Sequence, residues 1–285
     1  MLVRYRPYCG LTGCVQLRML EPAMSESLFA PNGVRRAALA LLLGVLLCLG
    51  ACASNGDEEE DYVEEPVDDL YNRAMDLMQQ GDDRAAARAF EEVERQHPYS
   101  EWATRAQLMA AYAFYEANNY DEAVAAARRF IDLHPGNKDV AYAYYLIGVS
   151  HYEQISDVGR DQKMTELALE AFDELIRRFP DSRYARDAEI KADLARDHLA
   201  GKEMEIGRYY LRRGEYVAAI NRFNNVIDRY QTTTHVAEAL HRLTEAYLAL
   251  GVPQEARRTA SVLGYNFPGS EWYQDSYALF AELPY

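Results

Sequence analysis

The chain has 285 residues, of which 49% are hydrophobic, and it carries 45 Asp and Glu against 30 Lys and Arg, a formal net charge of −15. This acidic balance argues against a nucleic-acid partner, because affinity for nucleic acids rests on Lys and Arg side chains that neutralise phosphates. All four cysteines lie in the first 52 residues, so the remaining sequence offers neither a disulfide framework nor cysteine ligands for a metal.

The chain begins with a segment typical of a secretory leader. Residues 37–51, AALALLLGVLLCLGA, form an apolar run behind Arg35 and Arg36 that has the length of a signal-peptide core but is short for a membrane-spanning helix. A start at Met24 gives a lipoprotein signal peptide of ordinary length, residues 24–51. Residues 1–23 contain no motif, and we predict that they are an upstream extension from a mis-assigned start codon.

Cys52 follows the apolar run directly, where it could serve as half of a disulfide, a metal ligand, a nucleophile or an anchor. Cleavage of the leader removes the other three cysteines and with them any disulfide partner. The tetrapeptide LGAC resembles the bacterial lipobox, which implies that Cys52 becomes the N-terminus and carries an S-diacylglycerol and an N-acyl chain. Two or three acyl chains make a stable membrane anchor. Ala53 and Ser54 follow instead of the aspartate associated with inner-membrane retention, so we expect the outer membrane; the alternative is an ordinary secretory peptide with an incidental cysteine.

The residues after this cysteine, 52–67, are expected to form a flexible tether. Nine of the 13 residues from 57 to 69 are acidic. Such a run is solvated and repels itself, so it should hold the folded part off the bilayer.

Beyond the tether, five segments share one pattern. Four of them end at a proline: AARAFEEVERQHP, AVAAARRFIDLHP, ALEAFDELIRRFP and ARRTASVLGYNFP. The fifth, YVAAINRFNNVIDRYQ, has Gln231 where the others have proline. Proline ends a helix because it lacks the N–H and clashes with the preceding turn. On a frame of 34 residues, small residues recur at positions 8 and 20, where two antiparallel helices approach closely. This spacing resembles the tetratricopeptide repeat and predicts an all-α solenoid of five helix-turn-helix repeats.

The period of these repeats is not constant. The alanines at position 20 are spaced by 37, 45, 51 and 37 residues, because the third repeat has an insertion around ISDVGRDQK and a long helical segment precedes the fourth. We therefore expect two lobes. Residues 68–180 hold repeats 1–3, and residues 181–285 hold a linking helix, repeats 4–5 and a C-terminal helix.

In the repeat family the first helix of each pair lines a concave groove. Tyrosines are common at these positions in repeats 1–3, which suits an extended peptide with aromatic side chains, because tyrosine offers a large contact area and a hydroxyl. The alternative is that these tyrosines only pack between repeats. The predicted groove residues are Tyr71, Met75, Arg105, Leu108, Tyr112, Tyr115, Tyr142, Tyr145 and Tyr152.

No catalytic set is found in the sequence. The six histidines show no i, i+4 pair on a helix, so a metal site is not expected. His97 and His134 precede prolines, where capping of a helix end is the expected role. There is no phosphate loop and no GxSxG motif. We therefore expect a protein that is not an enzyme and that has no cofactor apart from the lipid on Cys52.

Some longer stretches are more specific than a generic repeat. Among them are HPYSEWATRAQLMAAYAFYEANNYDEAV, HPGNKDVAYAYYLIGVSHYEQI and EWYQDSYALF. Together with LGAC they resemble the BamD family, lipoprotein subunits of the β-barrel assembly machinery, over about residues 68–280. The resemblance implies a scaffold on the periplasmic face of the outer membrane that helps to fold and insert β-barrel proteins.

Several partners follow from this resemblance. The N-terminal repeats would recognise the C-terminal strand of unfolded β-barrel outer-membrane proteins, with Arg105 facing the terminal carboxylate. The C-terminal repeats would dock the periplasmic domains of BamA beside other lipoproteins of the machinery, and the residues predicted for this docking are Arg222, Arg208 and Glu245. A solvated surface arginine is the alternative for Arg222. A different function, scaffolding of peptidoglycan enzymes or of a pilus secretin, also remains open for a lipoprotein of this kind.

Overall fold

The computed structural model of the chain describes residues 64–281. The upstream extension (1–23), the signal peptide (24–51), Cys52 and all but the last residues of the tether lie outside these residues. The expectations for them therefore stay predictions.

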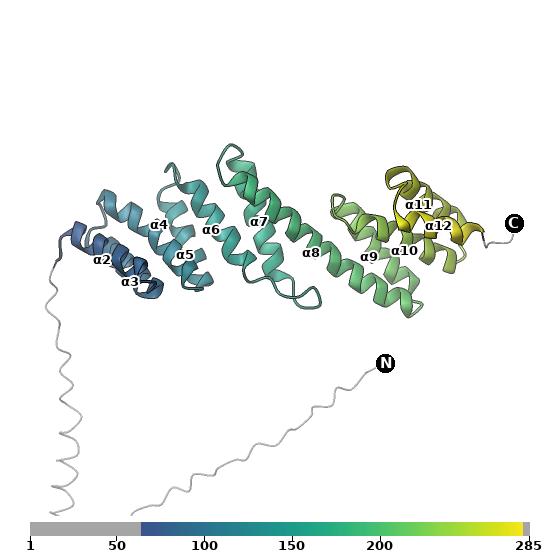
Figure 1. Cartoon of the computed structure of the whole chain (residues 1–285), viewed down its shortest axis with the longest axis horizontal. Helices are drawn as coiled ribbons and strands as arrows, with labels where there is room; N and C mark the ends of the chain where they lie inside the picture. Colours follow the sequence, from purple (N-terminus) through teal and green to yellow (C-terminus); the bar gives the residue numbers. More distant parts are fainter. Residues whose placement is uncertain (1–63, 282–285) are drawn as a thin grey trace, which may run out of the picture. The chain divides into compact units, whose positions relative to one another are not determined.

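The described residues form eleven α-helices and no strand, which confirms the all-α tetratricopeptide-like solenoid. Helices α2 to α11 make five antiparallel pairs in chain order, and α12 follows the last pair (Figure 1). The helices are α2 (Val67–Gln79), α3 (Asp83–Gln96), α4 (Glu101–Glu116), α5 (Tyr120–Leu133), α6 (Val140–Tyr152), α7 (Lys163–Arg178), α8 (Ala185–Arg212), α9 (Tyr216–Arg229), α10 (Val236–Ala249), α11 (Pro253–Asn266) and α12 (Glu271–Ala281).

The turns within four of the pairs share one backbone feature. Gly81, Gly214 and Gly251 have φ between +75° and +79°, and Asn118 has φ of +57°. Glycine and asparagine adopt this left-handed conformation at the lowest cost, and it turns the chain sharply at the end of a helix. The third pair lacks such a residue because its helices are joined by the longer loop 153–162.

The second helix of every pair ends in the same way. Phe179, which precedes Pro180, has φ −133° and ψ 57°, and Tyr230, which precedes Gln231, has φ −127° and ψ 44°. A residue before proline is driven out of the helical region by the proline ring. Because Tyr230 adopts this geometry without a proline, packing of its buried side chain also contributes to the helix end.

The two histidines before prolines lie at helix C-termini, as expected, and their side chains bond to other segments. His97 and His134 do occupy C-cap positions, but their Nε2 atoms lie 2.7 Å from the carbonyl oxygen of Glu65 and 2.8 Å from Oε1 of Gln107. Each side chain thus joins its helix end to another segment of the chain.

Close packing within the pairs depends on the small residue at position 8. A Cβ atom added to Gly148 would lie 2.4 Å from the ring of Phe172, and one added to Gly207 would lie 2.4 Å from the ring of Phe223. In both pairs the position-8 glycine therefore meets an aromatic ring of the second helix. Both rings are fully buried.

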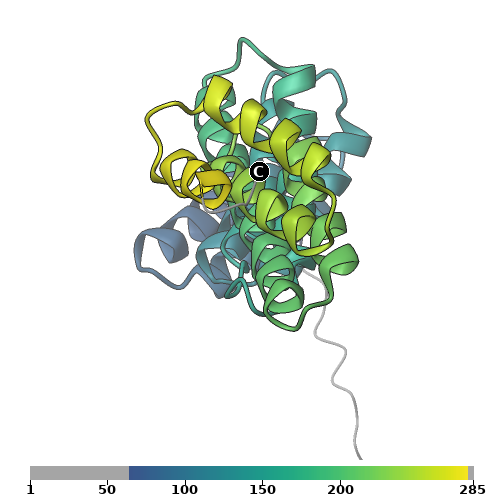
Figure 2. The same ribbon diagram turned by 90° about the vertical axis from the view of Figure 1, so that its right-hand side faces the viewer.

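Among the helices of residues 64–281, α8 is the longest, and it joins two hydrophobic cores. It has 28 residues and contains both the expected linking segment and the first helix of repeat 4. One cluster of buried side chains extends from Leu70 to Ala192, and the second extends from Leu199 to Leu263. Helix α12 closes the second cluster against α10 and α11 (Figure 2).

Candidate functional site

The first helices of the pairs lie along the inner side of the solenoid. The backbone of each first helix approaches that of the first helix of the next pair, as α2 approaches α4 and α4 approaches α6. The backbones of the second helices of neighbouring described pairs do not approach so closely, and α3 and α5 meet only through side chains such as Arg129 and Glu94. Helices that approach one another lie on the shorter, inner path of a curved stack. The residues predicted for the groove therefore lie on helices of the inner side.

Four tyrosines form a continuous aromatic stripe across repeats 2 and 3. The ring centroids of Tyr112 and Tyr142 are 6.4 Å apart, and Tyr184 lies 5.1 Å from Tyr142 and 5.2 Å from Tyr145. Aromatic rings at such distances attract each other beyond the gain from burial. All four side chains are partly exposed, so they pack on one another and still offer surface to a ligand. Tyr184 was missed in the sequence because it lies just before α8, outside the repeat frame.

The hydroxyl groups of Tyr112, Tyr142 and Tyr145 remain protonated at neutral pH, because the pKa of each is raised. Burial raises the pKa of Tyr142. Burial, followed by the hydrogen bond to Asp187, raises the pKa of Tyr145. The carboxylate of Glu116, together with burial, raises the pKa of Tyr112. The hydroxyl of Tyr145 already donates to Asp187, and that of Tyr112 is hydrogen-bonded to Glu116. The neutral hydroxyl of Tyr142 can donate a hydrogen bond to a carbonyl group of a peptide.

Tyr71, Arg105 and Leu108 come together at a separate place, a cavity of about 490 Å³ that we call the Arg105 cavity. Met109 and Phe130 add apolar surface, and Lys138, from the loop after α5, lies at the same cavity. In the described part of the chain neither Arg105 nor Lys138 has an ion-pair partner; the guanidinium of Arg105 lies 5.6 Å from the ring of Trp102. Lys138 was missed because nothing in the repeat pattern relates it to Arg105.

The remaining predicted groove residues pack mainly against the core. Met75 is half-buried against the first cluster, Tyr115 lies 5.9 Å from Tyr120, and Tyr152 lies 6.1 Å from the ring of Phe172. Tyr71 also contacts Trp102, at 4.7 Å. The two interpretations of the tyrosines therefore do not exclude each other, because one ring has both a packed face and an open face.

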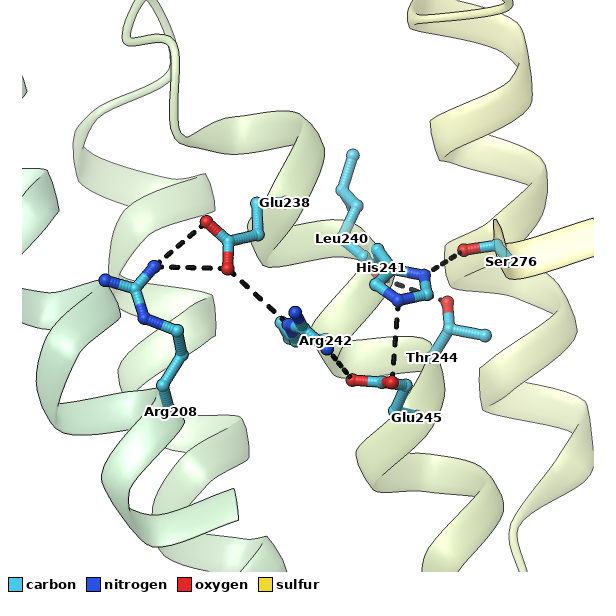
Figure 3. Close-up of polar contacts among 8 residues, drawn as sticks. All are labelled: Arg208, Glu238, Leu240, His241, Arg242, Thr244, Glu245 and Ser276. Carbon is cyan, nitrogen blue, oxygen red and sulfur yellow. Dashed lines mark hydrogen bonds and ion pairs between the residues drawn. The ribbon is translucent and has the colours of Figure 1, made fainter. Parts of the chain in front are cut away.

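Arg208 and Glu245, predicted for partner docking, belong to one chain of ion pairs across α8 and α10 (Figure 3). Arg208 Nη1 lies 2.9 Å from Glu238 Oε2. Arg242 lies between two carboxylates, with its Nε 3.5 Å from Glu238 Oε1 and its Nη1 2.8 Å from Glu245 Oε2. His241 extends the chain to α12, since its Nδ1 lies 2.8 Å from Ser276 Oγ. We call these residues the Arg242 network.

Electrostatics favour the charged form of Glu245 within this network. Burial raises the pKa of Glu245, but hydrogen bonds from His241 and Arg242 outweigh burial and lower it overall. Trp272 covers the network, with its ring 5.3 Å from the guanidinium carbon of Arg242. Tryptophan and arginine side chains are frequent among the residues that dominate binding at protein interfaces.

Arg222 lies apart from this network. It contacts Glu203 of α8 at 3.3 Å, and Asn225 donates to the same carboxylate at 3.2 Å. Its side chain is 39% exposed. The three predicted docking residues are therefore divided between two places on the C-terminal repeats.

The described residues contain no group of His, Cys, Asp and Glu that could hold a metal ion. Among the same residues no helix is both long enough and apolar enough to cross a membrane.

Comparison with known proteins relates this arrangement to one family. The profile of a family described as outer membrane lipoprotein (YfiO) matches residues 63–263. A protein of Caulobacter vibrioides named outer membrane protein assembly factor BamD is 53% identical over 218 residues, which are 76% of this chain and 72% of the relative. A protein of the same name from Rickettsia prowazekii is 47% identical over 241 residues, 85% of this chain and 95% of the relative. The solved TPR domain of P58(IPK) is similar with a TM-score of 0.40 and 16% identity, over 75% of this chain and 56% of that one.

Proposed function

The chain belongs to the YfiO family of outer membrane lipoproteins, and relatives in this family are named outer membrane protein assembly factors. From this premise we propose that the protein is a lipid-anchored, non-enzymatic scaffold in the assembly of β-barrel proteins. The scaffold holds the C-terminal strand of an unfolded substrate in repeats 1–3 and docks BamA through repeats 4 and 5. A role in outer membrane protein assembly rests on the family. The binding sites below are the more specific part of the proposal.

The observation that carries the substrate site is the pair of cations without ion-pair partners at the Arg105 cavity. Arg105 and Lys138 lie beside Tyr71, Leu108 and Met109, so the two cations adjoin an apolar and aromatic surface. The carboxylates of Glu101 and Asp139 also line this cavity, but within residues 64–281 neither forms an ion pair with the two cations. A peptide that ends in an aromatic residue supplies the matching groups, since its carboxylate pairs with the cations and its ring contacts the apolar wall. The aromatic stripe then receives the residues that precede the C-terminus.

The Arg242 network supports the docking part of the proposal. Its charges are satisfied within the chain, so a partner meets a fixed pattern of charge and not flexible side chains. Trp272 lies over this pattern and supplies apolar contact area. Such a surface suits a folded partner that stays bound, and we assign it to a periplasmic domain of BamA.

Binding of C-terminal peptides tests the substrate site. We expect a peptide of about ten residues that ends in phenylalanine to bind the full chain in detergent, with affinity measured by fluorescence anisotropy. Amidation of its C-terminus should weaken binding about tenfold, because one charge-assisted interaction contributes roughly 1.5–3 kcal/mol. Arg105→Gln should reduce the difference between the two peptides, and Lys138→Gln should act in the same direction.

Arg88→Gln is the matched control, since Arg88 is an exposed arginine of α3 that does not line the cavity. It should leave both affinities unchanged. Equal binding of the acid and the amide to the unaltered chain would exclude the carboxylate site. Copurification of a large barrel protein from solubilised outer membrane tests the docking part independently; recovery of cell-wall amidases or of a secretin instead would contradict it.

A further inference from the structure

One face of α8 continues from the aromatic stripe into the second half of the chain. Residues of this face follow one another at alternating intervals of three and four, which brings them to the same side of a helix. They are Tyr184 just before the helix, and then Asp187, Lys191, Leu194, His198 and Gly201 within it. The first of them belongs to the stripe, and the last three line a second cavity.

This second cavity, which we call the α8 cavity, has a volume of about 490 Å³ and lies between three segments. The loop 153–162 forms one wall, the middle of α8 forms the floor, and His235 at the start of α10 forms the other wall. Val158 and Leu194 supply apolar surface, and Leu194 is 54% exposed. Gly201 keeps the floor open, because a Cβ atom there would lie 3.3 Å from Nε2 of His235.

Both walls are held in place by buried or bridging polar groups. The buried amide of Gln162 donates to the carbonyl groups of Asp157, Val158 and Arg160 at 3.1–3.3 Å, and Lys202 of α8 donates to the carbonyl of Gly159 at 2.9 Å. On the other side, the carboxylate of Asp197 accepts hydrogen bonds from the backbone N–H and the hydroxyl of Thr234. The insertion in the third repeat is thus an ordered wall.

The charged groups at the rim are already engaged. Asp157 accepts from the N–H of Gly159, Arg208 pairs with Glu238, and Glu205 lies 3.9 Å from Lys202. His198 differs from them, because its Nε2 is buried and has no hydrogen-bond partner among the described residues. An unpaired polar atom in a buried place is costly, so the ring has hydrogen-bonding capacity that a ligand can use. Because this nitrogen is buried, binding of such a ligand requires the ring to rotate about χ2 toward the cavity.

We propose that the α8 cavity binds an aromatic side chain with a polar tip, a tyrosine or a tryptophan, of the same unfolded substrate that occupies the aromatic stripe. An aliphatic side chain would leave His198 unpaired, whereas the hydroxyl or indole N–H of such a residue pairs with it while its ring contacts Val158 and Leu194. This inference rests on the proposed function and adds a second anchoring point to it.

The length of α8 sets the spacing between the two anchoring points. Eleven residues separate Asp187 from His198, which corresponds to about 16 Å along a helix. An extended chain covers that distance with about five residues. Since the C-terminus is assigned to the Arg105 cavity and the chain runs toward α8, the aromatic residue for the α8 cavity lies about five positions before the residue that contacts Tyr145 and Tyr184.

Peptides of two lengths test this assignment on the full chain in detergent. The short peptide is the one of about ten residues described above. Each long peptide extends it at the N-terminus by about 14 serine and alanine residues, one of which is replaced by tyrosine. The position of this tyrosine differs from one long peptide to the next. We expect one position, or two neighbouring ones, to tighten binding about tenfold relative to the long peptide without tyrosine. Val158→Trp, which fills the cavity from a loop, and His198→Leu should both remove this gain without changing the affinity of the short peptide.

Val217→Trp is the matched control, since Val217 is a 63% exposed residue of α9 outside the cavity, and it should keep the gain. No gain at any tyrosine position, or an equal gain in the Val158→Trp variant, would overturn the proposal. If the short peptide fails to bind while one long peptide binds through its tyrosine, the Arg105 cavity is refuted and the α8 cavity is supported. If neither binds, both assignments are wrong.

Discussion

The hydroxyl of Tyr145 donates a hydrogen bond to Asp187 Oδ2 at 2.6 Å and so connects the third repeat to the first turn of α8. Lys191 lies 3.0 Å from the same carboxylate oxygen and 5.7 Å from the ring of Tyr152. These contacts fix the direction in which α8 leaves the aromatic stripe. They therefore fix the position of the α8 cavity relative to the aromatic stripe.

The Tyr145–Asp187 pair predicts a pH dependence of stability. The hydrogen bond from Tyr145, followed by the contribution of Lys191, lowers the pKa of Asp187 below its ordinary value of 3.8, although burial opposes this. A carboxyl group with a lowered pKa stabilises the fold above its unfolded-state value, and this stabilisation is lost as the pH falls through the folded-state value. Asp187→Asn should therefore flatten the loss of stability below about pH 4 in urea unfolding.

The control for this pH experiment is Asp132→Asn, which changes an exposed carboxylate of α5. It should leave the pH profile unchanged. A profile for Asp187→Asn identical to that of the unaltered chain would show that the carboxylate is not stabilised in the fold.

Gly207→Ala should destabilise repeat 4. The added methyl group would lie 2.4 Å from the buried ring of Phe223, and overpacking of this kind costs about 1–3 kcal/mol, more than the gain of about 1 kcal/mol from replacing glycine in a helix. Chemical denaturation monitored by circular dichroism measures the loss. Phe223→Leu in the same chain should recover part of it, and Gly136→Ala, with no atom within 4 Å, should be nearly neutral.

Arg242→Met should loosen the contact of α12 with α10. The substitution leaves Glu238 and Glu245 without their shared partner and removes the cation beside Trp272. The side chain of Arg242 is 27% exposed, so we expect a cost of about 1–2 kcal/mol, between the values for surface and buried pairs. In a Trp102→Phe background the fluorescence of Trp272 should change in the native state, whereas Arg257→Met, at an exposed position of α11, should leave it unchanged.

Tyr112→Ala should weaken binding of the C-terminal peptide while the helical content stays intact. The ring contributes to the aromatic stripe and is partly exposed, so its loss removes ligand surface without opening the core. We expect a several-fold change in affinity. Loss of helical signal in circular dichroism together with loss of binding would instead favour a purely structural role.

Cys52→Ser should release the protein from the outer membrane. Without an acylated cysteine no acyl chain holds the chain at the bilayer, and the acidic surface gives no attraction to anionic lipid. Membrane fractionation followed by detection of the protein measures the change, and peptide binding by the released protein shows that it is still folded. Retention of the variant in the outer-membrane fraction would contradict the lipid anchor.

The sequence alone was sufficient for much of the fold. The five repeats, the prolines that end the second helices and the long helical segment before repeat 4 were all visible as spacing, because each depends on residues near one another in the chain. Position 8 was also recognised as small, but its contact with Phe172 or Phe223 was not, since the ring lies on the other helix of the pair.

The candidate sites were only partly visible. Tyr112, Tyr142 and Tyr145 were predicted from the repeat frame, whereas Tyr184 and Lys138 lie outside that frame and join the sites through folding. Arg208 and Glu245 were predicted separately, and the structure places both in the Arg242 network.

By itself, the sequence determined which helices form and which of their faces are apolar, because helix periodicity, caps and breakers act over a few residues. Only the tertiary structure decided which of the remaining side chains meet. The loop 153–162, the buried Nε2 of His198 on α8 and His235 before α10 come from three segments up to about 80 residues apart. Their arrangement depends on how α6, α8 and α10 pack. Local helix propensity contains no information on that packing. The packing follows from the burial of apolar side chains in two separate cores, both of which include residues of α8.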